Sequence, residues 1–599
     1  IIYMPTNSPI NQRIEALRQA MRTHHIDAYI IPSGDAHLSE YTPERWKSRT
    51  WISGFTGSAG TALVTLDKSF MWTDSRYYLQ ATNELQGSEM TLQRGDEPDT
   101  PTIEQYLSTH LSEGAVVGVD GACYSMAEYA PLAQSLANHG IKLVSQYDLI
   151  EEVWSDRPGV PTNTFYLQDV KFSGERTRDR LQRIREAYQS YGAEAVAITM
   201  VDELCWSFNI RGNDVSYNPV GIAFGFIDNE QAYLFALPEK TVPELRQILN
   251  GEGVEVCDYD TFYDFLSKLP QGLKVMVDPK RTSQRVREEL GERPVITGDS
   301  VISHLKSIKN EAEIAGIHRA MHRDGVALTR FFIWLEQALQ KGEHVDEYTA
   351  GETLQQFRAK QEFYVSDSFG VICGYKGHGA IVHYSATPES AYKLEPEGML
   401  LLDSGGQYID GTTDITRTIA LGPVTDQQRT DFTLVLKGHI AIATARFPKG
   451  TRGNQLDILA RKALWDRGLS YGHGTGHGVG VFMNVHEGPQ NIRTDNNPTP
   501  MHLHTFTSNE PGLYRADQYG IRIENLILTV EKEQTEFGTF YGFETMTLCF
   551  LDNALVDKSL LTDQEIAWYN DYQEHVYQEL SPLLTPEEAE WLRNKTLPL

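Results

Sequence analysis

The stretch GHGTGHGVG, residues 472–480, alternates glycine with other residues and sets His473 and His477 four positions apart. Glycine frees the backbone and removes side-chain bulk, so this stretch allows the backbone to approach a neighbour or a ligand closely. A dinucleotide-binding fold needs GxGxxG between a strand and a helix, and no register of the stretch fits that pattern. The chain also has no GxxxxGK[ST] motif. The stretch therefore excludes a phosphate loop and leaves the two histidines as candidate metal ligands or acid–base groups.

The stretch LLLDSGGQYIDGTTDITRT, residues 400–418, carries two carboxylates in a predicted hairpin. An apolar strand runs into Asp403, a turn-rich middle follows, and Asp414 opens the return strand. A hairpin centred between Tyr408 and Ile409 would set Asp403 opposite Asp414. The Asp-Gly pair that follows would place the turn slightly later, and the pairing would then need a bulge or a wide loop.

The stretch SNEPGLYRADQYGIRIENLILTV, residues 508–530, carries two more carboxylates. Glu510 is predicted at the end of a strand, just before a Pro-Gly turn. Glu524 is predicted in an alternating strand, where it faces the same way as Arg522 and opposite to the neighbouring isoleucines. A carboxylate within such an apolar strand needs a partner, because burying an unpaired charge is costly.

Taken singly, each of these residues also fits a structural role. Asp403 could end a turn, Glu510 could be a loop acid, Glu524 could pair with Arg522, and His477 could be a hydrogen-bonded loop residue. Taken together, four carboxylates and one imidazole suit two divalent ions of the Mn, Co or Zn kind.

Composition excludes several classes of protein. The net charge of −28 argues against a nucleic-acid partner or an anionic membrane surface, since both require a basic face. The five cysteines include no CxxC pair, which favours a reducing compartment and disfavours cysteine-bound zinc. No apolar run is long enough to span a membrane. The opening IIYMPTNSPINQ lacks a basic segment followed by an apolar one, so we expect no signal peptide.

A repeated order of elements predicts two related α/β domains in tandem. RIEALRQAM from Arg13 resembles RLQRIREAY from Arg180, and DAYII from Asp27 resembles EAVAI from Glu194, both at one constant offset. Both members of the first pair are predicted as helices and both members of the second pair as strands. FMWTDSRYYLQ, residues 70–80, also reads as strand-like. The proline-rich segment at residues 155–163 is the predicted boundary between the two domains. One long amphipathic helix over residues 301–342 is predicted to open a third unit.

These motifs resemble the pita-bread metallopeptidases, and within them the Xaa-Pro aminopeptidase (aminopeptidase P) branch. The match includes DSGGQYIDGTTDITRT, HGTGHGVG, NVHEGP, SNEPGLY and GIRIEN. AYIIPSGDAHLSEY, SGFTGSAGTA, MWTDSRYYLQA and WSFNIRGNDVSYNPV extend it to the first two domains of the long, three-domain cytosolic form. The resemblance thus covers nearly the whole chain. It implies an α/β fold in which two related N-terminal α/β domains, creatinase-like at 1–156 and a second at 157–304, precede a pita-bread catalytic domain at 305–599.

The resemblance also assigns roles to single residues. The implied metal ligands are Asp403, Asp414, His477, Glu510 and Glu524. Asp414 and Glu524 would bridge two ions, Asp403 would cap one, and His477 and Glu510 would cap the other around a shared hydroxide. Glu510 would also carry a proton from the water to the leaving nitrogen.

Residues outside the metal shell have implied roles as well. His383, His473 and His486 would act in catalysis and bind the substrate, and Arg76 of the first domain is a further expected substrate contact. The sequence departs from the family pattern at two places. His378 stands where an asparagine is usual, and MHLHTF, with His502 and His504, precedes Glu510. We interpret His502 and His504 as a solvated strand pair.

We therefore expect a cytoplasmic, metal-dependent aminopeptidase that removes the first residue from peptides with proline in second position. The expected cofactors are two divalent ions, Mn²⁺ first, with Co²⁺ or Zn²⁺ as alternatives, and the expected assembly is a homodimer. A prolidase acting on Xaa-Pro dipeptides is the nearest alternative, but that family usually lacks a third domain. A methionine aminopeptidase would be much shorter. A non-enzymatic pita-bread binding protein, or a metal-free hydrolase such as creatinase, would be expected to have lost ligands.

Overall fold

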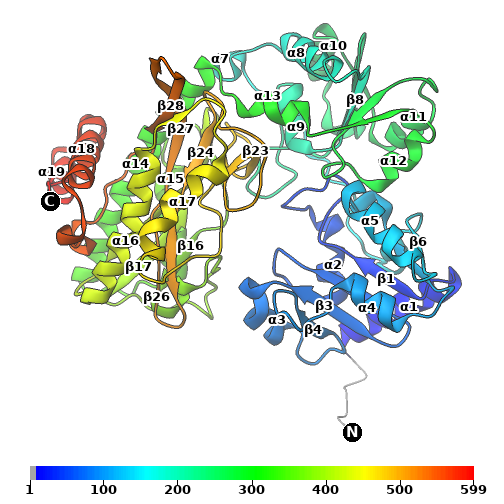
Figure 1. Ribbon diagram of the computed structural model, residues 1–599, viewed down its shortest axis with the longest axis horizontal. Coiled ribbons are helices and arrows are strands. Elements are labelled where there is room, and N and C mark those ends of the chain that lie inside the picture. Colours follow the sequence, from blue (N-terminus) through cyan, green and yellow to red (C-terminus); the bar gives the residue numbers. More distant parts are fainter. Residues whose placement is uncertain (1–7) are drawn as a thin grey trace. The chain divides into compact units, whose positions relative to one another are not determined.

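The computed structural model describes residues 8–599 and divides the chain into two compact units (Figure 1). The first unit runs through Gln168 and includes Glu175–Ser216 and Val220–Ile302. The second comprises Asp169–Gly174, Tyr217–Pro219 and Ser303–Leu599. Residues 1–7, on which part of the expectation about a signal peptide rests, lie outside the described residues. Across residues 8–599, no helix is both long enough and apolar enough to cross a bilayer.

The first unit begins with a six-stranded mixed sheet in the order β4-β3-β2-β1-β5-β6. Its central strand β1 (Ala28–Ile31) is antiparallel to β2 (Thr61–Thr65) and parallel to β5 (Val116–Val119). All four side chains of β1 are buried, and alternate ones enter two separate apolar clusters. A strand covered on both faces needs apolar residues at every position, which explains the run AYII. The other elements are β3 (Ser69–Thr73), β4 (Thr91–Arg94), β6 (Lys142–Val144), α1 (Pro9–Thr23), α2 (Ser48–Ser53), α3 (Tyr78–Glu84), α4 (Ile103–His110), α5 (Met126–Ala137) and α6 (Leu149–Val153).

A second six-stranded sheet repeats the first, in the order β12-β11-β10-β8-β13-β14. Its central strand β8 (Ala195–Ile198) is again antiparallel to one neighbour, β10 (Phe224–Asp228), and parallel to the other, β13 (Val275–Val277). The two central strands are the segments DAYII and EAVAI, so the predicted tandem repeat is confirmed. The other elements are β11 (Ala232–Ala236), β12 (Val254–Asp258), β14 (Val295–Thr297), α8 (Thr177–Gln189), α9 (Val201–Ser207), α10 (Pro243–Gly251), α11 (Phe262–Ser267) and α12 (Gln284–Leu290).

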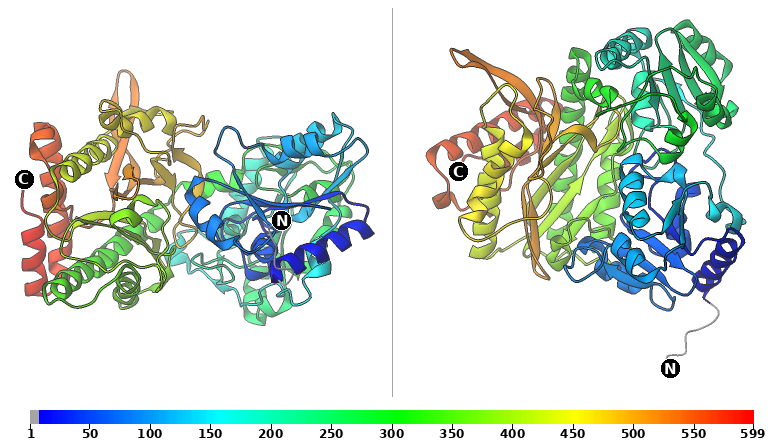
Figure 2. Two further views of the ribbon diagram at one scale, coloured as in Figure 1. Left: turned by 90° about the horizontal axis from the view of Figure 1, so that it is seen from below. Right: turned by 45° about the vertical axis from the view of Figure 1, so that its right-hand side comes forward.

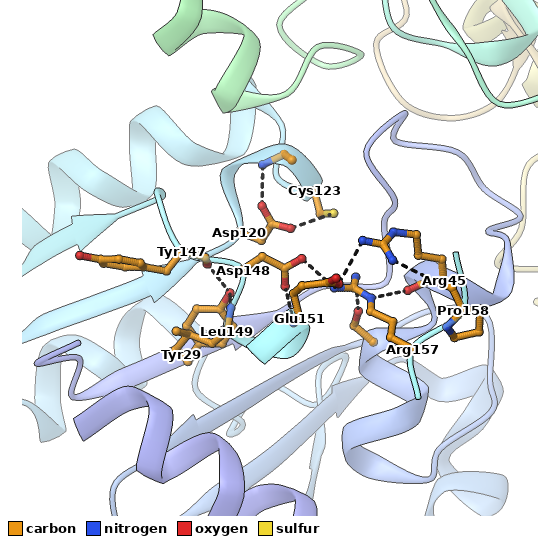
Figure 3. A network of polar contacts seen from close by, with 12 residues as sticks. Tyr29, Arg45, Asp120, Cys123, Tyr147, Asp148, Leu149, Glu151, Arg157 and Pro158 are labelled. Atoms are coloured by element: carbon orange, nitrogen blue, oxygen red, sulfur yellow. Dashed lines mark hydrogen bonds and ion pairs between the residues drawn. The ribbon is translucent and has the colours of Figure 1, made fainter. Parts of the chain in front are cut away.

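A network of ion pairs fixes the start of the predicted linker at residues 155–163 (Figure 3). Arg157 Nη1 donates to Asp148 Oδ2 (2.7 Å) and Glu151 Oε2 (2.8 Å), and its Nε donates to the carbonyl of Arg45 (2.9 Å). Arg45 Nη1 in turn donates to the carbonyl of Pro158 (2.9 Å). The linker therefore leaves the first sheet along a defined path.

The second unit contains a six-stranded antiparallel sheet in the order β21-β28-β27-β24-β22-β23 and the smaller sheets β16-β17-β20, β15-β18-β19 and β25-β26. The outer strands of these sheets include β15 (Tyr364–Asp367), β16 (Ile372–Tyr375), β21 (Phe447–Pro448) and β23 (Glu487–Ile492). Figure 2 shows its longest strands, β27 (Asn525–Thr535) and β28 (Gly538–Thr545), projecting as an orange hairpin. One large apolar cluster joins helix and strand residues, among them Phe331, Leu402, Leu436 and Leu528. The helices are α14 (Glu311–Gln340), α15 (Glu347–Ala359), α16 (Asp426–Ala443), α17 (Gly453–Trp465), α18 (Asp563–Leu580) and α19 (Pro586–Lys595). The strands that carry the site are β17 (Met399–Ser404), β18 (Gly406–Tyr408), β19 (Gly411–Thr412), β20 (Ile415–Ala420), β22 (Gly476–Gly478), β24 (Phe506–Asn509), β25 (Gly512–Arg515) and β26 (Tyr519–Arg522).

The predicted pairing of Asp403 with Asp414 is wrong by two residues. In β17–β20, Asp403 pairs with Thr416, and the short hairpin β18–β19 pairs Tyr408 with Gly411. The turn thus lies one residue later than predicted, nearer the Asp-Gly pair. Because Asp414 and Thr416 are two residues apart, they share a face, and the two carboxylates still lie on the same side.

The single long helix predicted over residues 301–342 is also wrong, because it is two helices. α13 (Val301–Ser307) ends, and α14 begins after Asn310, whose side chain forms a capping box with Glu313. The break lets Ile308 bridge Thr505. The predicted end is confirmed, since Lys341 caps α14 and Gly342 has a φ of +71°.

The strand-like reading of residues 70–80 holds only for β3, which ends at Thr73. Asp74 then caps a short 3₁₀ helix by accepting the N–H of Arg76 (3.1 Å). Capping by a side chain overrode the β propensity of the aromatic residues that follow.

Candidate active site

The five predicted ligands lie at strand ends of the second unit. Asp403 is at the end of β17 and Asp414 directly precedes β20, whereas His477 lies within β22. Glu510 follows β24, as predicted. Glu524 lies between β26 and β27 rather than inside one strand, and there it bridges Thr416. These ends bring five residues from five separate segments into one region.

His477 stands between two of the carboxylates. Its Nε2 lies 3.3 Å from Asp414 Oδ2 and 3.3 Å from Glu510 Oε1. Its Nδ1 lies 2.9 Å from the carbonyl of Gly478, which can only accept, so Nδ1 carries the proton and Nε2 faces the carboxylates. Burial lowers the pKa of His477, but the hydrogen bond to Asp414 and the charge of Glu510 outweigh burial and raise it to about 9.

Asp403 and Glu524 are joined through Arg522 and Thr416. Arg522 Nη2 and Nε donate to Asp403 Oδ2 at 2.7 and 3.2 Å. The hydroxyl of Thr416 donates to Glu524 Oε2 (2.8 Å) and accepts from Arg522 Nε (3.2 Å). Arg522 therefore holds Asp403 directly and reaches Glu524 through the hydroxyl of Thr416.

The chemistry of this cluster fits divalent cations. Asp403 Oδ1 and Glu524 Oε1 are buried and accept no hydrogen bond from residues 8–599. Burial raises the pKa of Asp403 to about 6 and that of Glu510 to about 7, and it raises the pKa of Glu524 well above its usual value. Donor atoms of Asp414, His477 and Glu524 all lie within 4.8 Å of one another, close enough to share an ion. Carboxylate oxygens with one imidazole nitrogen suit Mn, Co or Zn.

Close backbone packing explains the glycines around His477. A Cβ at Gly476 would overlap the carbonyl of Ser508 in the neighbouring strand, and one at Gly478 would lie 2.5 Å from the carbonyl of Glu487. The N–H of His477 donates to Ser508 Oγ (2.9 Å), and that hydroxyl donates to Glu510 Oε1 (3.0 Å). Glycine therefore allows β22 to lie against β24 with the histidine at the carboxylates.

His473 belongs to a hydrogen-bonded chain beside the cluster. Its Nδ1 lies 2.8 Å from the carbonyl of Gly474, so its Nε2 accepts from the hydroxyl of Tyr514 (2.7 Å). The same hydroxyl accepts from Arg522 Nη1 (2.7 Å), which continues the chain to Asp403. Burial, helped by the charge of Arg522, lowers the pKa of His473 to about 3, so the ring is neutral.

The other predicted histidines occupy different surroundings. The His486 ring meets the His477 ring edge-on, with centroids 4.5 Å apart. His383 is exposed and follows Val382, whose carbonyl accepts from Arg522 Nη2 (3.5 Å). His378, which departs from the family pattern, stacks on Tyr384 and Tyr392, and its Nδ1 lies 2.8 Å from Glu347 Oε2.

Two further expectations concern the segment with His502 and His504 and the position of Arg76. His502 and His504 are half-buried in a turn with His504 at a φ of +64°, so the predicted strand pair is wrong. The carbonyl of His504 accepts from the N–H of Lys309 (3.0 Å), which fixes that turn. Arg76 lies in the first unit, where its Nη2 donates to Asp74 Oδ2 (2.7 Å).

Four protein-family models match the chain. Two Creatinase/Prolidase N-terminal domain models match residues 13–153 and 156–313, metallopeptidase family M24 matches 315–531, and the C-terminal region of that peptidase matches 539–599. A Probable Xaa-Pro aminopeptidase P of Coprinopsis cinerea is 40% identical over 98% of each chain. Aminopeptidase P2 of Arabidopsis thaliana is 39% identical, over 96% of this chain and 86% of its own. The chain belongs to the aminopeptidase P family.

A solved structure of the aminopeptidase P family superposes on nearly the whole chain. X-prolyl aminopeptidase of Caenorhabditis elegans, described as a cytosolic enzyme with a di-nuclear active site, covers 98% of this chain with a TM-score of 0.92 and 33% identity. The predicted fold class, two creatinase-type α/β domains before a pita-bread domain, is confirmed. This family member is accordingly a metal-dependent aminopeptidase, and the binding-protein alternative is wrong.

Sequence reasoning missed several residues that contact the candidate ligands and their neighbours. Thr416 and Ser508 each hold a carboxylate, and Tyr514 links His473 to Arg522. The period-two pattern of β20 could have pointed to Thr416, because it shares a face with Asp414. Nothing in the local sequence of Tyr514 or Ser508 distinguishes them from ordinary strand residues.

Proposed function

We propose that this enzyme cleaves the bond between the first residue and proline in peptides Xaa-Pro-Xaa and longer. The observation that carries the proposal is the convergence of Asp403, Asp414, His477, Glu510 and Glu524, with buried carboxylate oxygens that accept no hydrogen bond from the described residues. Full-length similarity to relatives named Xaa-Pro aminopeptidase P supports the same substrate class.

The proposed cofactors are two divalent ions, with Mn²⁺ first. Asp403, Asp414 and Glu524 would hold one, and Asp414, Glu524, His477 and Glu510 would hold the other. Bound there, such ions polarise a carbonyl and make a water nucleophilic at neutral pH. The di-nuclear site described for the C. elegans enzyme supports this number of ions.

Glu510 is the proposed proton carrier. Its Oε1 is fixed by Ser508 and faces His477, so the carboxylate has one orientation toward the cluster. The leaving nitrogen of proline belongs to a tertiary amide and must gain a proton to depart. A positioned carboxyl group that accepts a proton early and returns it late serves both steps.

The histidines outside the shell have proposed roles at the substrate. His383 or His486 would donate to the oxyanion. The His486 ring packs against the His477 ring, and His383 follows Val382, whose carbonyl accepts from Arg522. His473, held by Tyr514, would contact the substrate or pass a proton. Arg76 of the first unit is retained as a proposed substrate contact.

We also propose a division into three domains, a homodimeric assembly and a cytoplasmic location. Three domains over 1–156, 157–304 and 305–599 are supported by the two repeated sheets and the spans of the family models. A cytoplasmic homodimer remains our proposal for the native state, and the cytosolic description of the C. elegans enzyme supports the location.

The test compares three peptides on one Mn²⁺-loaded preparation. We expect kcat/KM for Arg-Pro-Pro to exceed the values for Arg-Pro and for Arg-Ala-Ala. A dipeptide that wins by about tenfold, about 1.4 kcal/mol in transition-state binding, would establish the prolidase alternative instead. Equal rates for Arg-Ala-Ala and Arg-Pro-Pro would remove the requirement for proline.

A further inference from the structure

A buried ion pair on α17 contacts the glycine-rich loop at residues 471–475. Arg461 Nε donates to Asp457 Oδ2 (2.6 Å) and its Nη2 donates to Oδ1 (3.2 Å). The two side chains are only 4% and 2% exposed. Neither residue contributes a candidate metal ligand.

The pair holds three successive non-glycine residues of the loop. Arg461 Nη1 donates to the carbonyl of Tyr471 (2.6 Å), and its Nη2 donates to the carbonyl of His473 (2.8 Å). The guanidinium also lies 4.0 Å from the centre of the Tyr471 ring. The hydroxyl of Thr475 donates to Asp457 Oδ1 (2.6 Å).

This arrangement answers a difficulty that the sequence creates. Glycine has the largest conformational freedom of any residue, so a loop of alternating glycines is costly to hold in one conformation. A Cβ at Gly472 would meet nothing within 4 Å, so packing does not restrain the loop there. The backbone carbonyls on either side of Gly472 are bound by Arg461 instead.

The restrained loop leads directly to the candidate active site. The carbonyl of Thr475 accepts from the N–H of Glu510 (2.8 Å), and the ring of His473 accepts from Tyr514 (2.7 Å). A shift of the loop would therefore move His473 away from Tyr514. A misplacement of about 1 Å can cost about 100-fold in rate.

We propose that Arg461, oriented by Asp457, is a positioning residue that fixes loop 471–475 and thereby the place of His473. The inference rests on the proposed function for its kinetic readout. The planar guanidinium satisfies four acceptor atoms at once, whereas a lysine ammonium has a different geometry and fewer donors. Arg461→Lys therefore keeps the charge and removes the clamp.

The matched control is Arg180→Lys in the first unit. Arg180 is also buried, lies 4.4 Å from the Trp206 ring and donates to the carbonyl of Trp206 (2.6 Å). We expect Arg461→Lys to lower kcat for Arg-Pro-Pro by about 10–100-fold, with KM changed less than about threefold and metal content unchanged. Hydrogen exchange of amides in residues 471–478 should accelerate. The Arg180→Lys variant should show neither effect.

A double-mutant cycle with His473→Ala separates positioning from general destabilisation. If Arg461 acts through His473, the double variant should be no slower than His473→Ala alone, within about twofold. Two results would overturn the proposal. One is a double variant whose loss in kcat is the product of the two single losses, and the other is a normal kcat in Arg461→Lys. Should Arg461→Lys fail to fold, Thr475→Val removes one contact of the clamp and decides by the same criteria. If the wild type does not cleave Arg-Pro-Pro, the proposed function fails, while hydrogen exchange still tests the clamp.

Discussion

Asp410 and Asp414 lie four residues apart in one hairpin, yet their surroundings are opposite. Asp410 is buried between Arg319 Nε (2.9 Å) and Arg323 Nη1 (2.7 Å). Asp414 faces His477 and other carboxylates, among which Glu524 bears an acceptor oxygen without a hydrogen bond from the described residues. A paired carboxylate stabilises the fold, whereas clustered carboxylates repel one another until a cation is bound.

Asp414→Ala should therefore abolish activity without unfolding the enzyme. We expect kcat to fall by at least about 100-fold, with less than one ion retained per site by elemental analysis. The metal-free variant should still unfold in one cooperative thermal transition, because Asp414 lies in the carboxylate cluster and not in the apolar core. Asp410→Ala is the control, and it should lose stability but keep its metal. Near-normal metal content and rate in Asp414→Ala would disprove the ligand assignment.

His473 and His477 differ in the groups that their Nε2 atoms face. Nε2 of His477 lies 3.3 Å from an oxygen of each of two carboxylates, whereas Nε2 of His473 accepts a hydrogen bond from the hydroxyl of Tyr514. His477→Ala should lose metal. His473→Ala should keep it and lose about 10²–10⁴-fold in rate, the range for one acid–base group. Equal metal loss in both variants would mean that the ligand of the pair is misassigned.

At the scale of elements, β22 depends on the absence of side chains at both of its glycines, Gly476 and Gly478. Gly476→Ala would drive a Cβ into the backbone carbonyl of Ser508, and backbone cannot move aside as a flexible side chain can. We expect Gly476→Ala to lower the unfolding free energy by about 1–3 kcal/mol and to weaken metal binding. Gly472→Ala, which meets nothing within 4 Å, should leave both unchanged. Calorimetry and metal titration measure the two variants, and equal stability would contradict the packing argument.

Elements with a strong pattern were predictable from the sequence, and their joins were not. The apolar run of β1 and its echo in β8 gave the tandem domains, because a strand covered on both faces must be apolar throughout. The break in the long helix escaped prediction, since the capping side chain of Asn310 competed with a continuous amphipathic pattern. The predicted register of the hairpin was wrong because two strand pairs in different sheets, β17–β20 and β18–β19, set it together. Both pairings place the turn one residue later than the sequence pattern suggested.

The candidate site likewise contains residues that the sequence could predict and residues that it could not. The five carboxylate and histidine residues lie in motifs that a sequence displays, and the structure brings them together. The residues that orient them escaped, because their roles depend on contacts across long sequence separations. Thr416 reaches Glu524 across 108 residues, and Tyr514 reaches His473 across 41. Only tertiary packing brings such partners together.

For the molecule as a whole, the candidate site makes stability depend on pH. Burial raises the pKa of Asp403 from 3.8 to about 6 and that of Glu510 from 4.5 to about 7, and nearby carboxylates, outweighing burial, raise that of His477 from 6.5 to about 9. Between each pair of values the folded, metal-free enzyme holds a proton that the unfolded chain has released. The contribution of these three groups to the unfolding free energy therefore falls as pH rises through these windows, from about pH 4 to about pH 9. His473, whose pKa is lowered to about 3, contributes with the opposite sign below about pH 6.5, so the fall is clearest above that pH.

Metal should remove most of this dependence, because an ion takes the place of the protons and binds only deprotonated ligands. We expect the thermal midpoint of the chelated enzyme to fall between about pH 6.5 and 8.5, and that of the Mn²⁺-saturated enzyme to fall less, so that the stabilisation by metal grows with pH. Asp120, whose pKa burial also raises to about 6, lies in the first unit and contributes equally with and without metal. The difference between the two curves therefore isolates the site. In Glu510→Gln the chelated enzyme should show a shallower fall between about pH 5 and 7, since the amide cannot ionise. A chelated wild type whose midpoint rises with pH, or parallel curves with and without Mn²⁺, would mean that these carboxylates are not the place where metal and protons compete.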